Sequence, residues 1–197
     1  MMVIGLTGMI ASGKSTIAQA MRYYHLPVFD SDKSVHQLLG PKGRAVPAIL
    51  AEFGACGSWQ DGIDRPALGA IVFANSDALQ RLEEIVHPHV ARLRHSFIQQ
   101  ARISRRRAVI LDVPLLFETG IDKMCDITIT AWAPDALLRQ RALRRPAMTD
   151  EKLQGILAKQ MPQLEKIQHS DEKIATGLGR GVMMRQIKRC LVKWQLR

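Results

Sequence analysis

The sequence predicts an α/β fold of the phosphate-loop class, and three observations lead to this prediction. A short apolar run over residues 3–8 indicates a buried strand that ends at Gly8. Gly8-x-x-x-x-Gly13-Lys14-Ser15 continues from that glycine, and residues 15–24 follow as a helix, which is the context this phosphate-binding spacing requires. Much later, the apolar run of residues 108–112 ends in an acid, a pattern typical of a buried central strand in this class.

The residue types of this loop match the chemistry of a bound triphosphate. Glycines let the backbone curl until several N–H groups point at one anion. Lys14 then places a positive charge on the β- and γ-phosphates, the Ser15 hydroxyl is a ligand for Mg²⁺, and the positive end of the helix adds to anion binding. The expected nucleotide-binding residues are Gly8, Ala11, Ser12, Gly13, Lys14, Ser15 and Thr16.

Composition narrows the classes of partner. The chain has 197 residues, 47% of them hydrophobic, and a net charge of +10, which favours polyanionic partners. Because aromatic residues make up only 5% of the chain, we expect small polyanions such as nucleotides and no nucleic acid.

The sequence also predicts the cellular compartment of the protein. Its three cysteines are scattered without metal spacing, and we expect reduced, buried thiols in a cytoplasmic protein. The N-terminus has no signal-peptide pattern, and no apolar run approaches the ~20 residues that span a bilayer, so we expect no membrane partner.

Two carboxylates follow the second predicted strand, residues 26–29. Asp30 and Asp32 should stand beyond its carboxyl end, near the phosphate loop, with a helix beginning at Asp32 or just after. One carboxylate serves as a general base for a substrate hydroxyl and the other supports Mg²⁺, or the pair is a plain helix cap before a solvated turn. The segment itself does not decide between these interpretations.

A mostly helical insertion is expected between the second and third strands. His87-Pro88-His89 should separate a helix over 77–86, capped by Ser76, from a longer one. The two histidines lack a third ligand at metal spacing, so a helix junction or a substrate contact is the favoured interpretation. The earlier elements of the insertion are a helix containing Val46 to Phe53, a turn-rich connector over 54–62 and a short helix over 66–73.

The last third of the chain predicts a lid and the end of the sheet. A helix from Pro134 carries Arg139, Arg141, Arg144 and Arg145, which suits a lid over transferring phosphate, although some of these arginines should be solvated surface. The remaining expected elements are a strand over 126–132, a helix from Thr149 or Asp150 to about 160, an edge strand over 173–175, a loop over 177–181 and a helix over 182–194.

Taken together, these motifs resemble the dephospho-coenzyme A kinase family over about residues 3–177. The phosphate loop is shared by many kinases, whereas the Asp-x-Asp, His-Pro and Asp-Val-Pro-Leu-Leu-Phe-Glu segments are more particular to this family. The chain departs from the family at Lys173–Gly177, where relatives tend to carry an acid. The matching segments are residues 8–16, 30–32, 85–88, 111–118, 139–141, 145–146 and 158–162.

The resemblance implies ATP-dependent phosphorylation of the ribose 3′-hydroxyl of dephospho-coenzyme A on a nucleoside-monophosphate-kinase-like core of five parallel strands. Asp32 would be the base, and Lys14 and Arg141 would stabilise the transferring phosphoryl group. Ser15 would bind Mg²⁺, and Asp30, His87 and Asp112 would line the acceptor side. The expected division of the single domain is a core of about 1–31, 107–134 and 165–197, an acceptor-binding insertion of about 32–106 and a lid of about 135–164.

Three other functions fit parts of the sequence. A kinase of the same fold acting on a nucleoside monophosphate or shikimate is the nearest, but an insertion of this size favours a bulky acceptor. A GTP-driven switch should carry an Asn-Lys-x-Asp segment, which this chain lacks. A nucleic-acid binder should carry a recognition module, and the arginines are instead scattered. The sequence leaves the oligomeric state open.

Overall fold

The computed structural model describes residues 1–72 and 75–196, and these form two compact units. The first unit combines Met1–Phe29 with the chain from Ala101 onward, and the second is Asp30–Gln100. The finer division into core, acceptor-binding insertion and lid stays a prediction.

A five-stranded parallel sheet forms the centre of the first unit, in the order β2-β5-β1-β6-β7. β1 pairs in parallel with β5 and β6, and β6 pairs with β7. This confirms the predicted fold class, and the strand expected over residues 108–112 forms with those bounds and is entirely buried. The strands are β1 Met2–Gly8, β2 Val28–Asp30, β5 Ala108–Asp112, β6 Ile127–Trp132 and β7 Glu172–Ala175.

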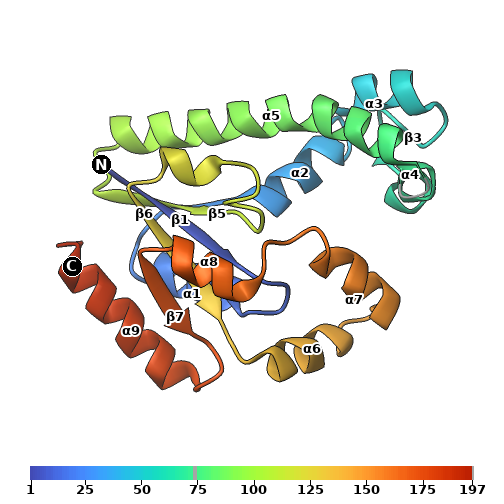
Figure 1. The fold of residues 1–197 in the computed structure, drawn as a ribbon. Helices are drawn as coiled ribbons and strands as arrows, with labels where there is room; N and C mark the ends of the chain where they lie inside the picture. Colours follow the sequence, from blue (N-terminus) through green and yellow to red (C-terminus); the bar gives the residue numbers. More distant parts are fainter. Residues whose placement is uncertain (73–74, 197) are drawn as a thin grey trace. The chain divides into compact units, whose positions relative to one another are not determined.

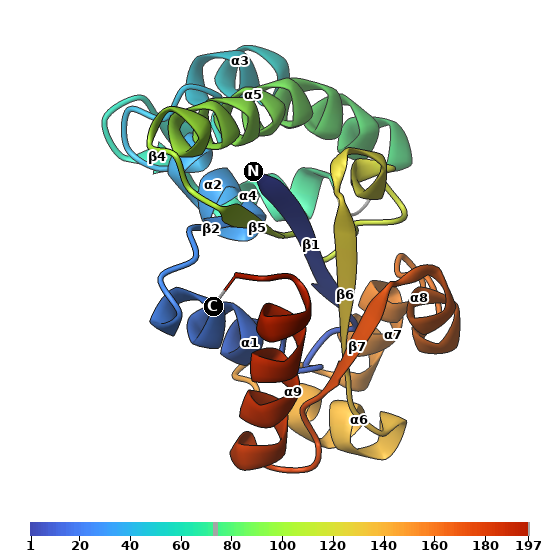
Figure 2. The same ribbon diagram turned by 90° about the vertical axis from the view of Figure 1, so that its left-hand side faces the viewer.

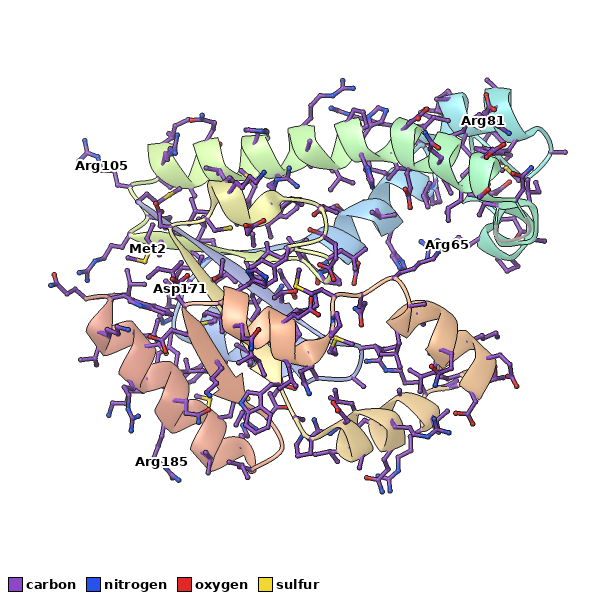
Figure 3. All side chains as sticks on the ribbon, in the orientation of Figure 1. Met2, Arg65, Arg81, Arg105, Asp171 and Arg185 are labelled. Atoms are coloured by element: carbon purple, nitrogen blue, oxygen red, sulfur yellow. The ribbon has the colours of Figure 1, made fainter. Side chains whose placement is uncertain are left out.

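Two helices cover one face of this sheet, α1 (Lys14–Tyr23) and α9 (Arg180–Lys193) (Figures 1 and 2). Side chains alternate between the faces of a strand, so Ile4 and Leu6 of β1 point to the same side. They join apolar residues of both helices in one buried cluster. In Figure 3, Arg185 extends outward from α9, as expected for the polar side of an amphipathic helix.

The segment that follows β5 and the helix that precedes β7 pack against the opposite face. Leu116 is fully buried, and its side chain fills the space above Gly5 where a β-carbon would stand. α8 (Gln163–His169) packs on β6. Between α8 and β7, the Asp171 carboxylate, labelled in Figure 3, accepts hydrogen bonds from the N–H and hydroxyl of Thr128, both at 2.8 Å.

The region predicted as a lid contains two helices, α6 (Asp135–Leu143) and α7 (Asp150–Leu157). Arg139 and Arg141 lie on α6, and Arg144 and Arg145 follow its end. The hydroxyl of Thr149 caps α7 by accepting a hydrogen bond from the Lys152 N–H at 3.3 Å. Helix α7 ends at Leu157, three residues before the predicted end, and α8 was not predicted from the sequence at all.

The second unit is mainly helical. Its helices are tied by an ion pair between Arg81 and Glu52 at 2.6 Å and by a contact of the same length between Arg65 Nη1 and His36 Nδ1; both arginines are labelled in Figure 3. The connector predicted over 54–62 contains part of a two-stranded hairpin. The predicted end of the short helix, at Phe73, lies outside the described residues. The last helix of the unit, α5, continues into the residues of the first unit. The elements are α2 Ser31–Leu39, α3 Val46–Phe53, β3 Gly57–Ser58, β4 Gly62–Ile63, α4 Arg65–Val72 and α5 Ser76–Ile103.

The prediction of two helices separated at His87-Pro88-His89 was wrong. Helix α5 runs unbroken through Pro88. Proline removes one N–H and crowds the preceding turn, but that cost is local, and a long amphipathic helix can absorb it. The predicted cap was also wrong, because the Asn75 side chain accepts the N–H groups of Asp77 and Ala78, at 2.9 and 3.2 Å, and Ser76 is the first helical residue.

Two smaller expectations change in the structure. The Asp30 side chain caps α2 by accepting the Lys33 N–H at 2.9 Å, so this helix begins at Ser31 and not at Asp32. All three cysteines are free, but only Cys56 and Cys190 are buried, and Cys125 is partly exposed.

Among the described residues, no helix is long and apolar enough to cross a membrane.

Candidate functional site

The phosphate loop joins the end of β1 to the start of α1. Two glycines make its shape possible. A β-carbon on Gly8 would lie 2.4 Å from the Ser12 hydroxyl oxygen, and Gly13 has a left-handed φ of +85°. At the first turn of α1, the N–H groups of Lys14 and Ser15 have no intrahelical acceptor, so they are available to an anion. The Ser15 side chain is exposed at this helix start.

Lys14 reaches from this loop to the end of β5. Its ammonium forms an ion pair with the Asp112 carboxylate, and the two side chains are 14% and 4% exposed. β5 lies beside β1 in a parallel sheet, so the carboxyl end of β5 is adjacent to the loop that follows β1. The sheet thus brings together two predicted site residues that are 98 positions apart.

Arg141 and Thr176 contact the other side of the loop. The Thr176 hydroxyl donates to the Ser12 carbonyl oxygen at 2.5 Å. Arg141, which is half-buried, donates from Nη1 to that hydroxyl at 3.2 Å and from Nη2 to the Thr176 carbonyl at 3.1 Å. Arg141 is therefore fixed beside the loop, whereas Arg139 pairs with Asp150 at 2.5 Å on the exposed surface between α6 and α7.

A buried lysine holds together the segment that follows α7. Lys166 of α8 is fully buried and pairs with Glu118 at 2.7 Å. Burial lowers the pKa of Lys166, and its hydrogen bond to Glu118 partly opposes this. Glu118 also accepts the Met161 N–H at 2.7 Å, and the neighbouring Gln160 accepts the Ile10 N–H of the phosphate loop at 3.0 Å. This segment is therefore bonded both to the loop and to the chain after β5.

A cavity of about 550 Å³ adjoins the tip of the phosphate loop. Met9 and Ile10 of the loop form one wall, and mainly apolar side chains of α6, α7 and α8 form the rest.

The remaining predicted residues lie in the second unit. The Asp30 carboxylate is used as a helix cap, as described above. Asp32 is exposed in the first turn of α2, and within the described part of the chain its carboxylate has no hydrogen-bond or ion-pair partner. His87 is exposed on α5, while burial and two arginines lower the pKa of its neighbour His89.

Sequence reasoning missed two residues of the first unit. Lys166 was missed because α8 was missed, although Glu165 in its first turn and Lys166 and His169 in its last turn match the helix dipole. Thr176 stood in the segment that departs from the family pattern, and no local signal in the sequence pairs it with Ser12.

The oxygen donors at the loop fit Mg²⁺. This ion keeps several waters and binds proteins through one or two oxygen ligands together with substrate phosphates, a role that the exposed Ser15 hydroxyl can fill. Over residues 1–72 and 75–196, no cluster of three or more His, Cys, Asp or Glu side chains forms a self-contained metal site.

A parallel sheet of this order, with a phosphate loop after β1 and an arginine of α6 held beside that loop, defines a P-loop kinase. A family model described as dephospho-CoA kinase matches residues 2–177. The chain belongs to the dephospho-CoA kinase family. It is accordingly an enzyme, a kinase of the family that catalyses the final step of coenzyme A biosynthesis.

Relatives and solved structures agree with this assignment. The chain is 47% identical over 187 residues to a dephospho-CoA kinase of Rhodospirillum rubrum, covering 95% of this chain and 89% of the relative. The dephospho-CoA kinase structure from Campylobacter jejuni has a TM-score of 0.69 at 25% identity, covering 97% and 96% of the two chains. A crystal structure from Thermus thermophilus has a TM-score of 0.81 at 28% identity, covering 98% and 96%.

Proposed function

We propose that the chain transfers the γ-phosphoryl group of ATP to the ribose 3′-hydroxyl of dephospho-coenzyme A, giving coenzyme A and ADP. The observation that carries the proposal is the Lys14–Asp112 pair at the mouth of the phosphate loop, in a chain of this family. This pair supports a triphosphate-binding site in which the lysine ammonium is already held at the position that the phosphates will occupy.

In the proposed reaction, the 3′-oxygen of the acceptor forms a bond to the γ-phosphorus while the bond from that phosphorus to the bridging oxygen of ADP breaks. Asp32 takes the proton of the attacking hydroxyl. Its exposed carboxylate supports this role, since the Asp30 carboxylate is already used as a helix cap. Asp30, His87 and Asp112 are proposed to line the acceptor side.

Charge stabilisation comes from Lys14 and Arg141. Negative charge spreads over the equatorial oxygens of the transferring group, and an ammonium and a planar guanidinium stabilise it when they are held in advance. The bonds of Lys14 to Asp112 and of Arg141 to Thr176 support such preorganisation. We further infer that α6 and α7 form a lid that excludes water.

The proposed metal is Mg²⁺, held by Ser15 and by the nucleotide phosphates. When bound, Mg²⁺ neutralises charge on the β- and γ-phosphate oxygens. The three free cysteines support a reducing, cytoplasmic setting for the reaction.

The test is ADP release by purified protein with Mg·ATP. Dephospho-coenzyme A is compared with AMP, CMP, shikimate and no acceptor, and coenzyme A is measured as product. Release stimulated only by dephospho-coenzyme A is the expected result. Stimulation by another acceptor, or by none, would overturn the proposed acceptor while leaving the nucleotide site in place.

The proposed base has its own mutational test. Asp32→Asn removes the proton acceptor, so kcat should fall by about 10² or more while the KM for ATP stays close to wild type. Asp30→Asn is the matched control, because asparagine also caps helices well and the variant should keep α2 intact with a smaller loss. Wild-type turnover in Asp32→Asn would refute the assignment.

A further inference from the structure

Thr176 forms a junction between three parts of the first unit. Its hydroxyl donates to the Ser12 carbonyl at 2.5 Å, and Arg141 donates to the hydroxyl and to the carbonyl of the same residue. Its N–H donates to the Trp132 carbonyl at the end of β6 at 3.0 Å. The phosphate loop, β6 and α6 therefore meet at one residue, at the end where β1, β6 and β7 terminate together (Figure 1).

The hydroxyl has the right hydrogen-bonding capacity for this position. It offers one proton and two lone pairs, and a guanidinium is only a donor. The proton therefore goes to a carbonyl, and Ser12 at 2.5 Å is much closer than Trp132 at 3.3 Å. The guanidinium then donates to a lone pair, so both neighbours of the hydroxyl are satisfied in one arrangement.

The bond to Ser12 also fixes the orientation of a phosphate-loop N–H. In a planar trans peptide the C=O of one residue and the N–H of the next point in opposite directions. Since the Ser12 carbonyl faces Thr176, the Gly13 N–H faces away from Thr176. Thr176 also packs directly on Gly13, where a β-carbon would lie 2.9 Å from its Cβ and Oγ1 atoms.

We propose that Thr176 is a positioning residue, whose hydroxyl holds the Ser12–Gly13 peptide in its phosphate-binding orientation and holds Arg141 beside the loop. The part that concerns Arg141 rests on the role proposed above for this arginine. Thr176 does not need to touch the reacting atoms, because it acts through a loop N–H and through a guanidinium that it hydrogen-bonds.

The experiment compares Thr176→Val, which keeps the shape and removes the hydroxyl, with Thr176→Ser, which keeps the hydroxyl and removes the methyl group. Two quantities are measured: the affinity for Mg·ADP by calorimetry, and kcat with Mg·ATP and dephospho-coenzyme A. Thr128→Val serves as the matched control, since it removes a hydroxyl that donates to the Asp171 carboxylate and accepts the Asp171 N–H in the same unit, away from the loop. If Thr176→Val does not fold, Thr176→Ala gives the same two readouts.

Thr176→Val should weaken Mg·ADP binding and lower kcat, each by about tenfold or more, because displaced donors lose most of their effect. Thr176→Ser should stay within about threefold of wild type, as should Thr128→Val. Wild-type ADP affinity in Thr176→Val overturns the proposal. Equal impairment in Thr176→Ser also overturns it, because packing on Gly13 would then be the whole effect. A wild-type chain that binds ADP but does not use dephospho-coenzyme A would refute the proposed acceptor, while the ADP comparison still decides on Thr176.

Discussion

Ala11 stands in the phosphate loop with a φ of 61°, in the left-handed region. A β-carbon makes this conformation costly, by roughly 1 kcal/mol, and glycine avoids that cost. Ala11→Gly should therefore raise the free energy of unfolding by several tenths to about 1 kcal/mol, measured by urea denaturation. The control is Ala51→Gly at an exposed position inside α3, where the same change should cost about 1 kcal/mol. A loss of stability at both positions would show that Ala11 is not strained.

The Lys166–Glu118 pair predicts strongly coupled mutations. Glu118→Gln keeps an acceptor for the Met161 N–H but leaves the fully buried ammonium without a counter-charge. Glu118→Gln should therefore lower the free energy of unfolding by about 3 kcal/mol. Adding Lys166→Met should recover most of that loss, because removing one partner of a buried ion pair destabilises the fold more than replacing both partners does. Urea denaturation of both single variants and the double variant tests this. Costs that simply add would contradict it.

The pH dependence of the same lysine has a definite sign. The pKa of Lys166 is lowered from its ordinary value of 10.5 by burial. Between the lowered pKa and 10.5 the unfolded chain binds the extra proton, so this residue makes the fold more stable as pH rises through that window. The stability advantage of wild type over Lys166→Met should therefore grow as pH approaches 10.5. A constant difference would contradict the lowered pKa.

At the scale of elements, α5 carries a proline inside 28 continuous helical residues. Pro88→Ala supplies the missing N–H and removes the ring clash, so it should stabilise the helix by about 2 kcal/mol, less the entropy that proline removes from the unfolded chain. Amide hydrogen exchange around position 88 should slow. Pro66→Ala in the first turn of α4 is the control and should change little, because proline is tolerated there. Unchanged exchange in Pro88→Ala would mean that Pro88 costs the helix nothing.

At the scale of the whole molecule, the net charge of +10 is the dominant electrostatic fact. Like charges repel in the compact state, and salt screens this repulsion. The Tm at pH 7 should therefore rise as NaCl increases from about 0.01 M to about 0.3 M, which calorimetry can follow. Near the isoelectric point of about 10.0 the rise should largely disappear. An equal rise at both pH values would point to a general salt effect instead of charge repulsion.

Local patterns predicted the parts of this protein that are stabilised locally. The run over 108–112 is entirely apolar up to its final acid, a pattern typical of a parallel strand that is buried on both faces of the sheet. The phosphate loop was predictable from its spacing, because Gly13 stands where the loop needs a left-handed residue, observed at +85°, and Lys14-Ser15 follows it directly. The later motifs predicted membership of the dephospho-CoA kinase family through their resemblance to it, and the match of the family model confirmed that prediction.

Other features depend on contacts that no local pattern contains. Pro88 is a helix breaker by its own propensity, yet the helix continues through it, with Val86 and Val90 buried on either side. Helix α8 is only seven residues long, too short to be stable alone, and it exists because Lys166 is buried against Glu118 and the Pro114 carbonyl.

By itself, the sequence determined the strands of the parallel sheet, the phosphate loop and the chemistry of the side chains available to a nucleotide. Only the tertiary structure decided which of these side chains meet. Thr176 and Ser12 are 164 positions apart, and they are joined because β7, β6 and β1 end at the same edge of a parallel sheet. Hydrophobic periodicity specifies which face of a strand is buried, whereas the order of strands sets which loops become neighbours.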